Sequence, residues 1–174
     1  MAQPPEDSDR LKRLMSVPAE KWHKTLQYEG GDTAGIPGEF LYPEKGTGRV
    51  FLPAESFRTQ PSSHEVQTAL TLAESGDEVL FRIDSNHPGV KNPDVEIAST
   101  IWEFKAPEGS TIRTIENQMK RAGKQAENLV LDLRRSGLDD AEALSVVKRR
   151  LAAHSHLTRV IVIDHSGNAI TLNK

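Results

Sequence analysis

The chain of 174 residues is 36% hydrophobic and 27% charged, which is the composition of an ordinary soluble globular protein. It has no cysteine, which excludes disulfides, thiolate metal sites and thiol nucleophiles, and no apolar stretch long enough for a membrane span or a signal peptide. The formal net charge of −3 argues against a protein that coats nucleic acid through bulk charge, although residues 110–159 carry 10 Lys and Arg against 6 Asp and Glu.

Residues 1–58 are predicted to form a loosely ordered, variable N-terminal segment, because glycine and proline interrupt any regular pattern there. Two apolar pairs, Phe40-Leu41 and Val50-Phe51, flank the turn-rich PEKGTG and allow a short hairpin, whose length Pro43 limits. The sequence therefore predicts a boundary near residue 58, with one domain over residues 59–174.

A regular α/β pattern begins at residue 62. Apolar residues repeat at helical spacing through SSHEVQTALTLAESG, and Gly76 follows them as a C-terminal cap. Short apolar runs such as EVLFRI and VIVID, bounded by turn residues, predict strands. The expected helices are 62–76, 111–127 and 139–154, and the expected strands are 78–83, 94–98, 100–105, 128–134, 160–164 and 169–173.

Two carboxylates are predicted to face each other across the second and third of these strands. A tight connection centred on Ala98-Ser99 places Asp94 directly opposite Glu103. Like charges in that arrangement destabilise a sheet unless something offsets them. A divalent cation, Mg²⁺ or Mn²⁺, would offset them, because it prefers oxygen ligands.

Lys105 shares a strand face with Glu103, whereas Trp102 and Phe104 are expected to point into the core. A metal ion with a lysine beside it suits phosphodiester hydrolysis: the ion withdraws charge from the scissile phosphate, and Lys105 can orient a water or steady the developing oxyanion. The alternative is that Glu103 and Lys105 are solvent-facing strand residues and that Asp94 merely follows a proline.

Pro93-Asp94 followed by Glu103-Phe104-Lys105 resembles the motif of PD-(D/E)XK nucleases, which lies on the second and third strands of an α-β-β-β-α-β core. The element order expected over residues 62–134 matches that core, and the resemblance implies a restriction-endonuclease-like fold, a mixed sheet flanked by helices. Many members add an acidic residue from the first helix, where Glu65 stands here. The run KNPDVEIASTIWEFKAP, with Lys124-Gln125 and LVLDL after it, is most similar to C-terminal toxin domains of CdiA-type contact-dependent growth inhibition proteins.

The resemblance covers about residues 60–165. It implies cleavage of tRNA, neutralisation by a cognate immunity protein, and action in the bacterial cytoplasm after delivery as part of a larger secreted protein, with residues 1–58 serving cell import or linkage. A DNA endonuclease of the same fold and a non-catalytic binding module remain alternatives. The complete set of Asp94, Glu103 and Lys105 argues against the binding module, which would have no reason to keep facing carboxylates.

Glu65 has two interpretations. Ser62-x-x-Glu65 fits a capping box, in which the glutamate bonds the first amide of the helix. Glu65 also lies on the flank of the apolar stripe and is expected to face the sheet, where it would join Asp94 and Glu103 as a metal ligand.

The second expected helix contributes a cationic surface. Arg113, Lys120 and Lys124 fall along one face with Gln125 beside them, and such a row can follow a phosphate backbone. Lys124 and Gln125 are expected nearest to the scissile phosphate, and an acidic immunity protein is expected to cover this surface. A merely solvated helix face is the alternative. The residues interpreted as plain surface or left without a role are Lys148, Arg149, Arg150, His154, His156 and His165.

Overall fold

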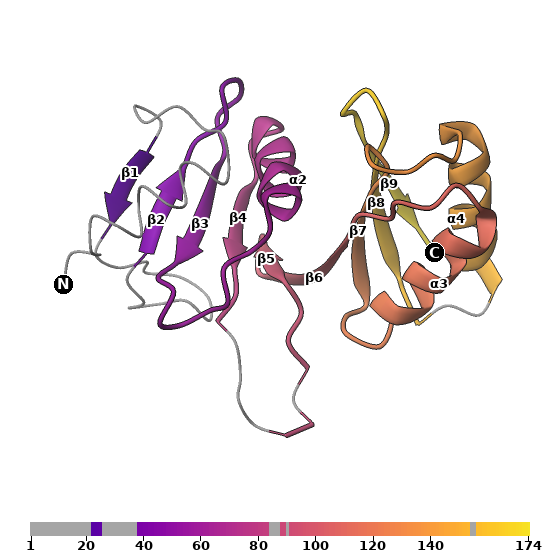
Figure 1. Cartoon of the computed structure of the whole chain (residues 1–174), viewed down its shortest axis with the longest axis horizontal. Helices are drawn as coiled ribbons and strands as arrows, with labels where there is room; N and C mark the ends of the chain where they lie inside the picture. The colour runs from indigo at the N-terminus through magenta and orange to yellow at the C-terminus, as the bar shows by residue number, and fades with distance from the viewer. Residues whose placement is uncertain (1–21, 26–37, 84–87, 90, 154–155) are drawn as a thin grey trace. The chain divides into compact units, whose positions relative to one another are not determined.

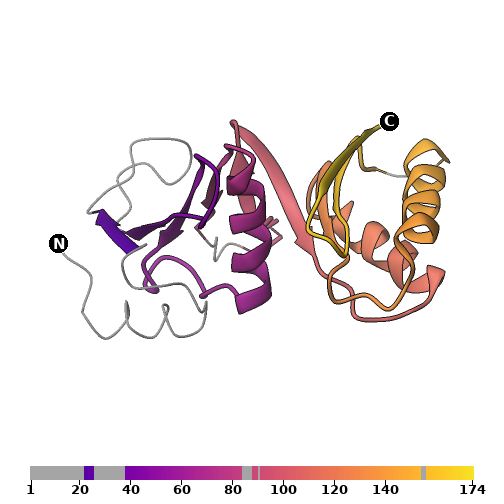
Figure 2. The ribbon, with the colours of Figure 1, turned by 90° about the horizontal axis from the view of Figure 1, so that it is seen from above.

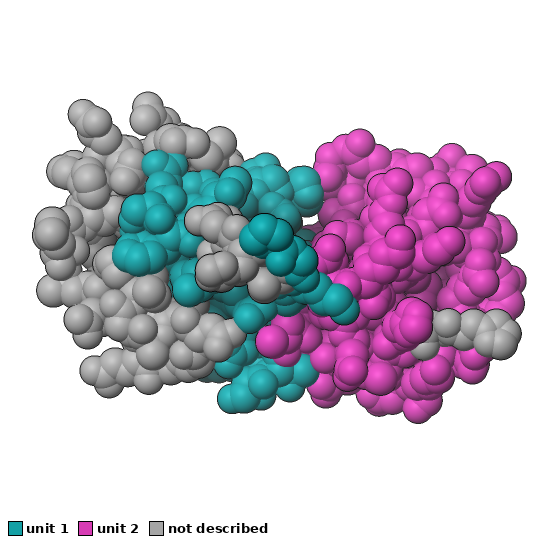
Figure 3. Space-filling model, turned by 90° about the horizontal axis from the view of Figure 1, so that it is seen from below, with its two compact units in different colours: residues 1–100 teal, residues 101–174 magenta. Residues whose placement is uncertain are grey.

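The computed structural model describes residues 22–25, 38–83, 88–89, 91–153 and 156–174. The chain divides into two compact units, residues 1–100 and residues 101–174, which Figure 3 shows in different colours. Each unit combines a sheet with helical cover, so the predicted mixed α/β class is confirmed. None of the described helices is long and apolar enough to cross a membrane.

The sheet of the first unit has the strand order β1-β2-β3-β4-β5 (Figure 1). Its strands are β1 (Trp22–Thr25), β2 (Gly38–Leu41), β3 (Arg49–Pro53), β4 (Glu78–Phe81) and β5 (Val95–Ile97). Neighbouring strands are antiparallel except β3 and β4, which run parallel. Helix α2 (Ser63–Glu74) makes the crossover between these two parallel strands and packs against both of them.

The expectation of a loosely ordered segment up to residue 58 is wrong for residues 38–53, which form β2 and β3. Phe40 pairs with Phe51 and Leu41 with Val50, so the two apolar pairs do form the hairpin. Leu41, Val50 and Phe51 are fully buried, because β3 also pairs with the distant strand β4. Residues 1–21 and 26–37 lie outside the described residues, and the boundary near residue 58 stays a prediction.

Helix α2 begins and ends close to where the sequence predicts. Ser62 caps its N-terminus, and Val66, Ala69 and Ala73 on its inner face are fully buried. Gly76, just beyond the helix, has a φ of 99°, a left-handed conformation that glycine adopts without steric cost.

The second unit has the strand order β6-β7-β8-β9. Its strands are β6 (Thr100–Lys105), β7 (Asn128–Asp132), β8 (Arg159–Ile163) and β9 (Ala169–Asn173). The first three are parallel, and β9 returns antiparallel to β8. Helices α3 (Ile112–Ala122) and α4 (Asp140–Ala153) make the two crossovers and lie on one face of this sheet, as Figure 2 shows.

Helix α3 is shorter than predicted, because it ends at Ala122 with Gly123 as its C-cap. The amides of Lys124 and Gln125 then bond the carbonyls of Arg121 and Ala122 in a turn. Lys124 and Gln125 therefore follow the helix rather than belong to it, and the apolar spacing that continues to residue 126 misplaced the helix end. The start of α4 is as predicted, because the carboxylate of Asp139 accepts bonds from the amides of Ala141 and Glu142.

Candidate functional site

Strand β6 carries the acid and the lysine of the predicted motif. Glu103 is only 5% exposed, and its carboxylate forms an ion pair with the ammonium group of Lys105. The parallel register aligns Glu103 with Leu129 and Lys105 with Leu131, which belong to the core beneath α3 and α4. Both side chains therefore share one face, as predicted, and the burial of Glu103 contradicts the alternative in which it faces solvent.

The opposite face of β6 is buried as well. Trp102 and Phe104 are 4% and 5% exposed, as the alternation of side chains predicts. The guanidinium of Arg159 lies 4.7 Å from the ring centre of Trp102, a cation–π contact. On the face of Glu103, Ile101 is 36% exposed and Lys105 is partly exposed, so Glu103 is a buried carboxylate between more accessible neighbours. A buried carboxylate is costly unless a cation or hydrogen-bond donor accompanies it, and Lys105 is such a cation.

Asp94, just before β5, contacts Arg58. Nη2 of Arg58 lies 3.8 Å from Oδ1 of Asp94, and Nη1 donates to the main-chain oxygens of Arg82 and Asp94 at 2.8 and 3.3 Å. Arg58 is buried, with its guanidinium 5.0 Å from the ring centre of Phe81. Sequence reasoning missed Arg58, because a single arginine in a polar loop gives no local signal of a partner 36 residues away.

The connection from β5 to β6 consists of Ala98 and Ser99, as predicted. Their φ angles are 48° and 61°, and two consecutive positive φ angles are what a type I′ turn requires. Asp94 belongs to the first unit and Glu103 to the second, so the predicted facing of their carboxylates stays a prediction.

Glu65 completes a capping box at the start of α2. Its Oε2 accepts from the amide of Ser62 at 2.6 Å and from the Ser62 hydroxyl at 2.8 Å, while its own amide bonds the Ser62 hydroxyl. The capping interpretation is therefore confirmed. These bonds use Oε2, and the second interpretation, in which Glu65 is a metal ligand, stays a prediction.

A cavity of 770 Å³ lies beside α3 in the second unit. Arg113, Lys120 and Lys124, the cations expected to bind substrate, all line it. Gln125 is not among the lining residues. Arg150 of α4 and His156 also line it, although no pattern in the sequence places these two residues beside α3.

Glu116 joins α3 to α4 at the edge of this cavity. Its Oε1 lies 3.0 Å from Nη2 of Arg149 and 3.0 Å from Nε of Arg150. The hydrogen bonds from Arg150 and Arg149 hold the pKa of Glu116 below its usual value. The carboxylate therefore stays ionised at neutral pH and fixes the orientation of the Arg150 guanidinium.

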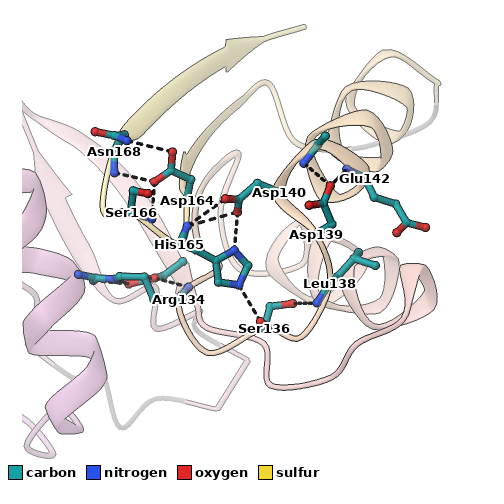
Figure 4. Close-up of polar contacts among 12 residues, drawn as sticks. Arg134, Ser136, Leu138, Asp139, Asp140, Glu142, Asp164, His165, Ser166 and Asn168 are labelled. Carbon is teal, nitrogen blue, oxygen red and sulfur yellow. Dashed lines mark hydrogen bonds and ion pairs between the residues drawn. The ribbon is translucent and has the colours of Figure 1, made fainter.

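A second polar cluster, which sequence reasoning missed, surrounds His165 in the turn between β8 and β9 (Figure 4). Nδ1 of His165 lies 2.7 Å from Oδ1 of Asp140, and Nε2 lies 2.7 Å from the main-chain oxygen of Ser136. Both partners are acceptors, so both ring nitrogens donate only in the protonated imidazolium. The bonds to Ser136 and Asp140 raise the pKa of His165.

Asp132 is a further buried acid, at the carboxyl end of β7. It is 4% exposed, and its Oδ2 lies 2.6 Å from Nη2 of Arg134. The signal that could have identified it is the one that identified Glu103, an acid within an apolar strand, here LVLDL.

The proposed metal ligands can be tested against the geometry of each unit. Among the described residues, no three His, Asp or Glu side chains are gathered closely enough to hold a metal ion together. The carboxylates of Asp94 and Glu103 nevertheless fit the chemistry of Mg²⁺, which typically uses one or two protein carboxylates and completes its shell with water and substrate phosphates.

Comparisons with known proteins identify the family. The contact-dependent growth inhibition CdiA C-terminal domain matches residues 91–169. A solved CdiA-CT/CdiI toxin and immunity complex from Burkholderia pseudomallei is 30% identical, with a TM-score of 0.54, and the match covers 64% of this chain and 83% of that chain. The chain belongs to the CdiA C-terminal domain family. It is a toxin domain of contact-dependent growth inhibition, as the motif-based resemblance implies.

The CdiA C-terminal domain match contains Asp94, Glu103, Lys105 and the whole of α3, and it leaves out Glu65. No curated protein sequence matches the chain.

Proposed function

We propose that this CdiA C-terminal domain is a metal-dependent endonuclease of the PD-(D/E)XK type that hydrolyses phosphodiester bonds of RNA, with tRNA as its substrate. The observation that carries the proposal is the ion pair on strand β6 between the buried carboxylate of Glu103 and the partly exposed Lys105. Burying an ion pair often costs as much free energy as the pair returns. Stability alone therefore does not explain this ion pair, and the position of Glu103 and Lys105 in the predicted motif favours a chemical role for them.

Asp94 and Glu103 are the proposed ligands of Mg²⁺ or Mn²⁺. Glu65 is the predicted third ligand, and it would have to leave its capping bonds to join them, because no three such side chains are gathered among the described residues. The ion would supply positive charge beside the scissile phosphate. Lys105 would donate from Nζ to the attacking water or to a phosphate oxygen that gains negative charge. Without an ion, Lys105 balances the charge of Glu103 and Arg58 contacts Asp94, so both carboxylates have cationic neighbours before a ligand binds.

The cations of α3 and the turn after it are the proposed substrate contacts. Arg113, Lys120 and Lys124 line one cavity, and none of them has an ion-pair partner among the described residues. Cations without an internal partner are available to phosphates, whereas Gln125 beside them can contribute only hydrogen bonds.

A cognate immunity protein is the proposed protein partner, and the similarity to a toxin and immunity complex supports it. We expect this protein to be acidic and to compete with nucleic acid for the cations of α3. Its association rate should fall with added salt, and fall again in the Lys120→Ala, Lys124→Ala variant. The toxin would act in the cytoplasm of a neighbouring bacterium after delivery within a larger secreted protein. If the product of the adjacent reading frame neither binds this chain nor protects cells from it, the proposal of a cognate immunity protein is wrong.

The proposed activity is tested by incubating the purified chain with total RNA and with plasmid DNA, with and without Mg²⁺. We expect RNA cleavage that requires Mg²⁺, is lost in Asp94→Ala and Lys105→Ala, and is unchanged in Lys148→Ala, which alters an exposed lysine on α4. Cleavage of DNA alone would identify the DNA endonuclease alternative. A folded protein that cleaves neither nucleic acid would overturn the enzyme proposal.

A further inference from the structure

The cavity beside α3 has two features that a solvated helix face lacks. Its volume of 770 Å³ falls within the range of pockets that hold small organic ligands, roughly 300–1,000 Å³. Its lining also includes Ile112, which is partly exposed, beside Met119, which is 3% exposed and belongs to the core of the second unit, so the accessible apolar surface comes mainly from Ile112. The cavity can therefore accept a group that is partly apolar.

The charges around the cavity favour an anion. Arg113, Lys120 and Lys124 have no ion-pair partner among the described residues, and Arg150 is the fourth cation of the lining. The lining contains one carboxylate, Glu116, which Arg149 and Arg150 already share. The excess of positive charge raises the local concentration of anions.

We propose that this cavity binds one phosphorylated nucleotide of the nucleic acid substrate, with the cations against its phosphate and with Ile112 beneath its base. A bare inorganic anion would leave the apolar surface unused, whereas a nucleotide combines a charged phosphate with a flat, largely apolar base. The inference rests on the proposed nuclease function for the identity of the ligand, and it adds a pocket that selects one nucleotide of the substrate. Arg150 and His156 become binding residues in this assignment.

The test is calorimetric titration of the whole chain, without Mg²⁺, with the four nucleoside 5′-monophosphates, with the nucleosides and with inorganic phosphate. We expect at least one monophosphate to bind about tenfold or more tightly than its nucleoside or phosphate alone, a difference of about 1.4 kcal/mol. Lys120→Ala and Lys124→Ala should each weaken that binding about tenfold. Arg121→Ala is the matched control, because it removes an exposed cation of the same helix that does not line the cavity, and it should change the affinity less than about twofold.

A steric variant separates the contribution of the cavity's shape to binding from the contribution of its charges. Asn117 is exposed and lines the cavity, so Asn117→Trp fills the space while keeping every cation, and it should weaken monophosphate binding as much as Lys120→Ala does. Unchanged binding in Asn117→Trp, equal affinity for phosphate and monophosphate, or no binding of any monophosphate would each overturn the inference. RNA cleavage without monophosphate binding contradicts only the assignment of the cavity as a nucleotide pocket. Monophosphate binding by a chain that cleaves neither RNA nor DNA contradicts the nuclease proposal.

Discussion

The ammonium group of Lys105, which is partly exposed, contacts the buried carboxylate of Glu103 two positions earlier on β6. Lys105→Ala removes this ammonium group from a buried carboxylate, so we expect the free energy of unfolding to fall by about 2–4 kcal/mol. Glu103→Gln should cost less, because the amide keeps the shape and removes the buried charge. Urea denaturation measures both variants. Lys148→Ala, on the exposed face of α4, should stay within about 0.5 kcal/mol of wild type, and a Lys105→Ala variant of wild-type stability would contradict this account.

The two interpretations of Glu65 can be separated with two substitutions. Glutamine can make the bonds of a capping box, so Glu65→Gln should keep the melting temperature, whereas Glu65→Ala should lose about 1 kcal/mol of stability. A metal ligand, in contrast, requires the charge. We therefore expect Glu65→Gln to lose cleavage without losing stability. If Glu65→Gln cleaves RNA like wild type, Glu65 is a capping residue and not a ligand.

Arg58 is predicted to matter for folding. Arg58→Ala removes the guanidinium bonds to the main-chain oxygens of Arg82 and Asp94, although the Asp94 oxygen keeps its bond from the amide of Arg82. It also removes the cation beside the Asp94 carboxylate. We expect a loss of about 2–3 kcal/mol by urea denaturation. Arg58→Lys should recover only part of it, because an ammonium group cannot reproduce the planar fork of donors. The exposed Lys45 provides the control, since Lys45→Ala should have almost no effect. Full recovery by Arg58→Lys would show that charge alone is required.

His165 should make stability depend on pH. Its pKa is raised in the folded chain, so its stabilisation is complete below the unfolded value of about 6.5 and is lost as the pH rises through the folded value. The effect should stay below about 1 kcal/mol, because water screens two side chains that are each about a third exposed. Melting temperatures of wild type and His165→Gln between pH 5.5 and 8.5 measure it. The gap between the two should narrow as the pH rises, and a constant gap would show that protonation of His165 contributes nothing.

The regular elements of the chain could be predicted wherever local pattern decides the structure. The apolar spacing of α2, the alternation of β6 and the turn residues between β8 and β9 each specify their element within a few positions. Strands β2 and β3 could not be assigned in this way, because their burial depends on pairing between β3 and β4. The end of α3 was also misjudged, since Gly123 ends the helix although the apolar spacing continues beyond it.

The residues of the candidate site also differ in whether a local pattern or a long-range contact identifies them. Glu103 and Lys105 were identifiable because a charged pair interrupts an apolar strand. The contacts of Asp94 with Arg58 and of Asp140 with His165 join residues 36 and 25 positions apart, and such pairs have no local signature. The sequence predicted the cations that α3 and its following turn bring to the cavity. It did not predict Arg150 and His156, because they reach the cavity from segments that follow α3 in the chain.

The burial of Trp102 has a spectroscopic consequence. An indole in an apolar environment emits at shorter wavelength than one in water, so Trp102 should shift its fluorescence to the red when the second unit unfolds. The chain has two tryptophans, and the other, Trp22, lies in β1 of the first unit. In a Trp22→Phe background, therefore, the emission would come from a single residue that is the immediate neighbour of Glu103.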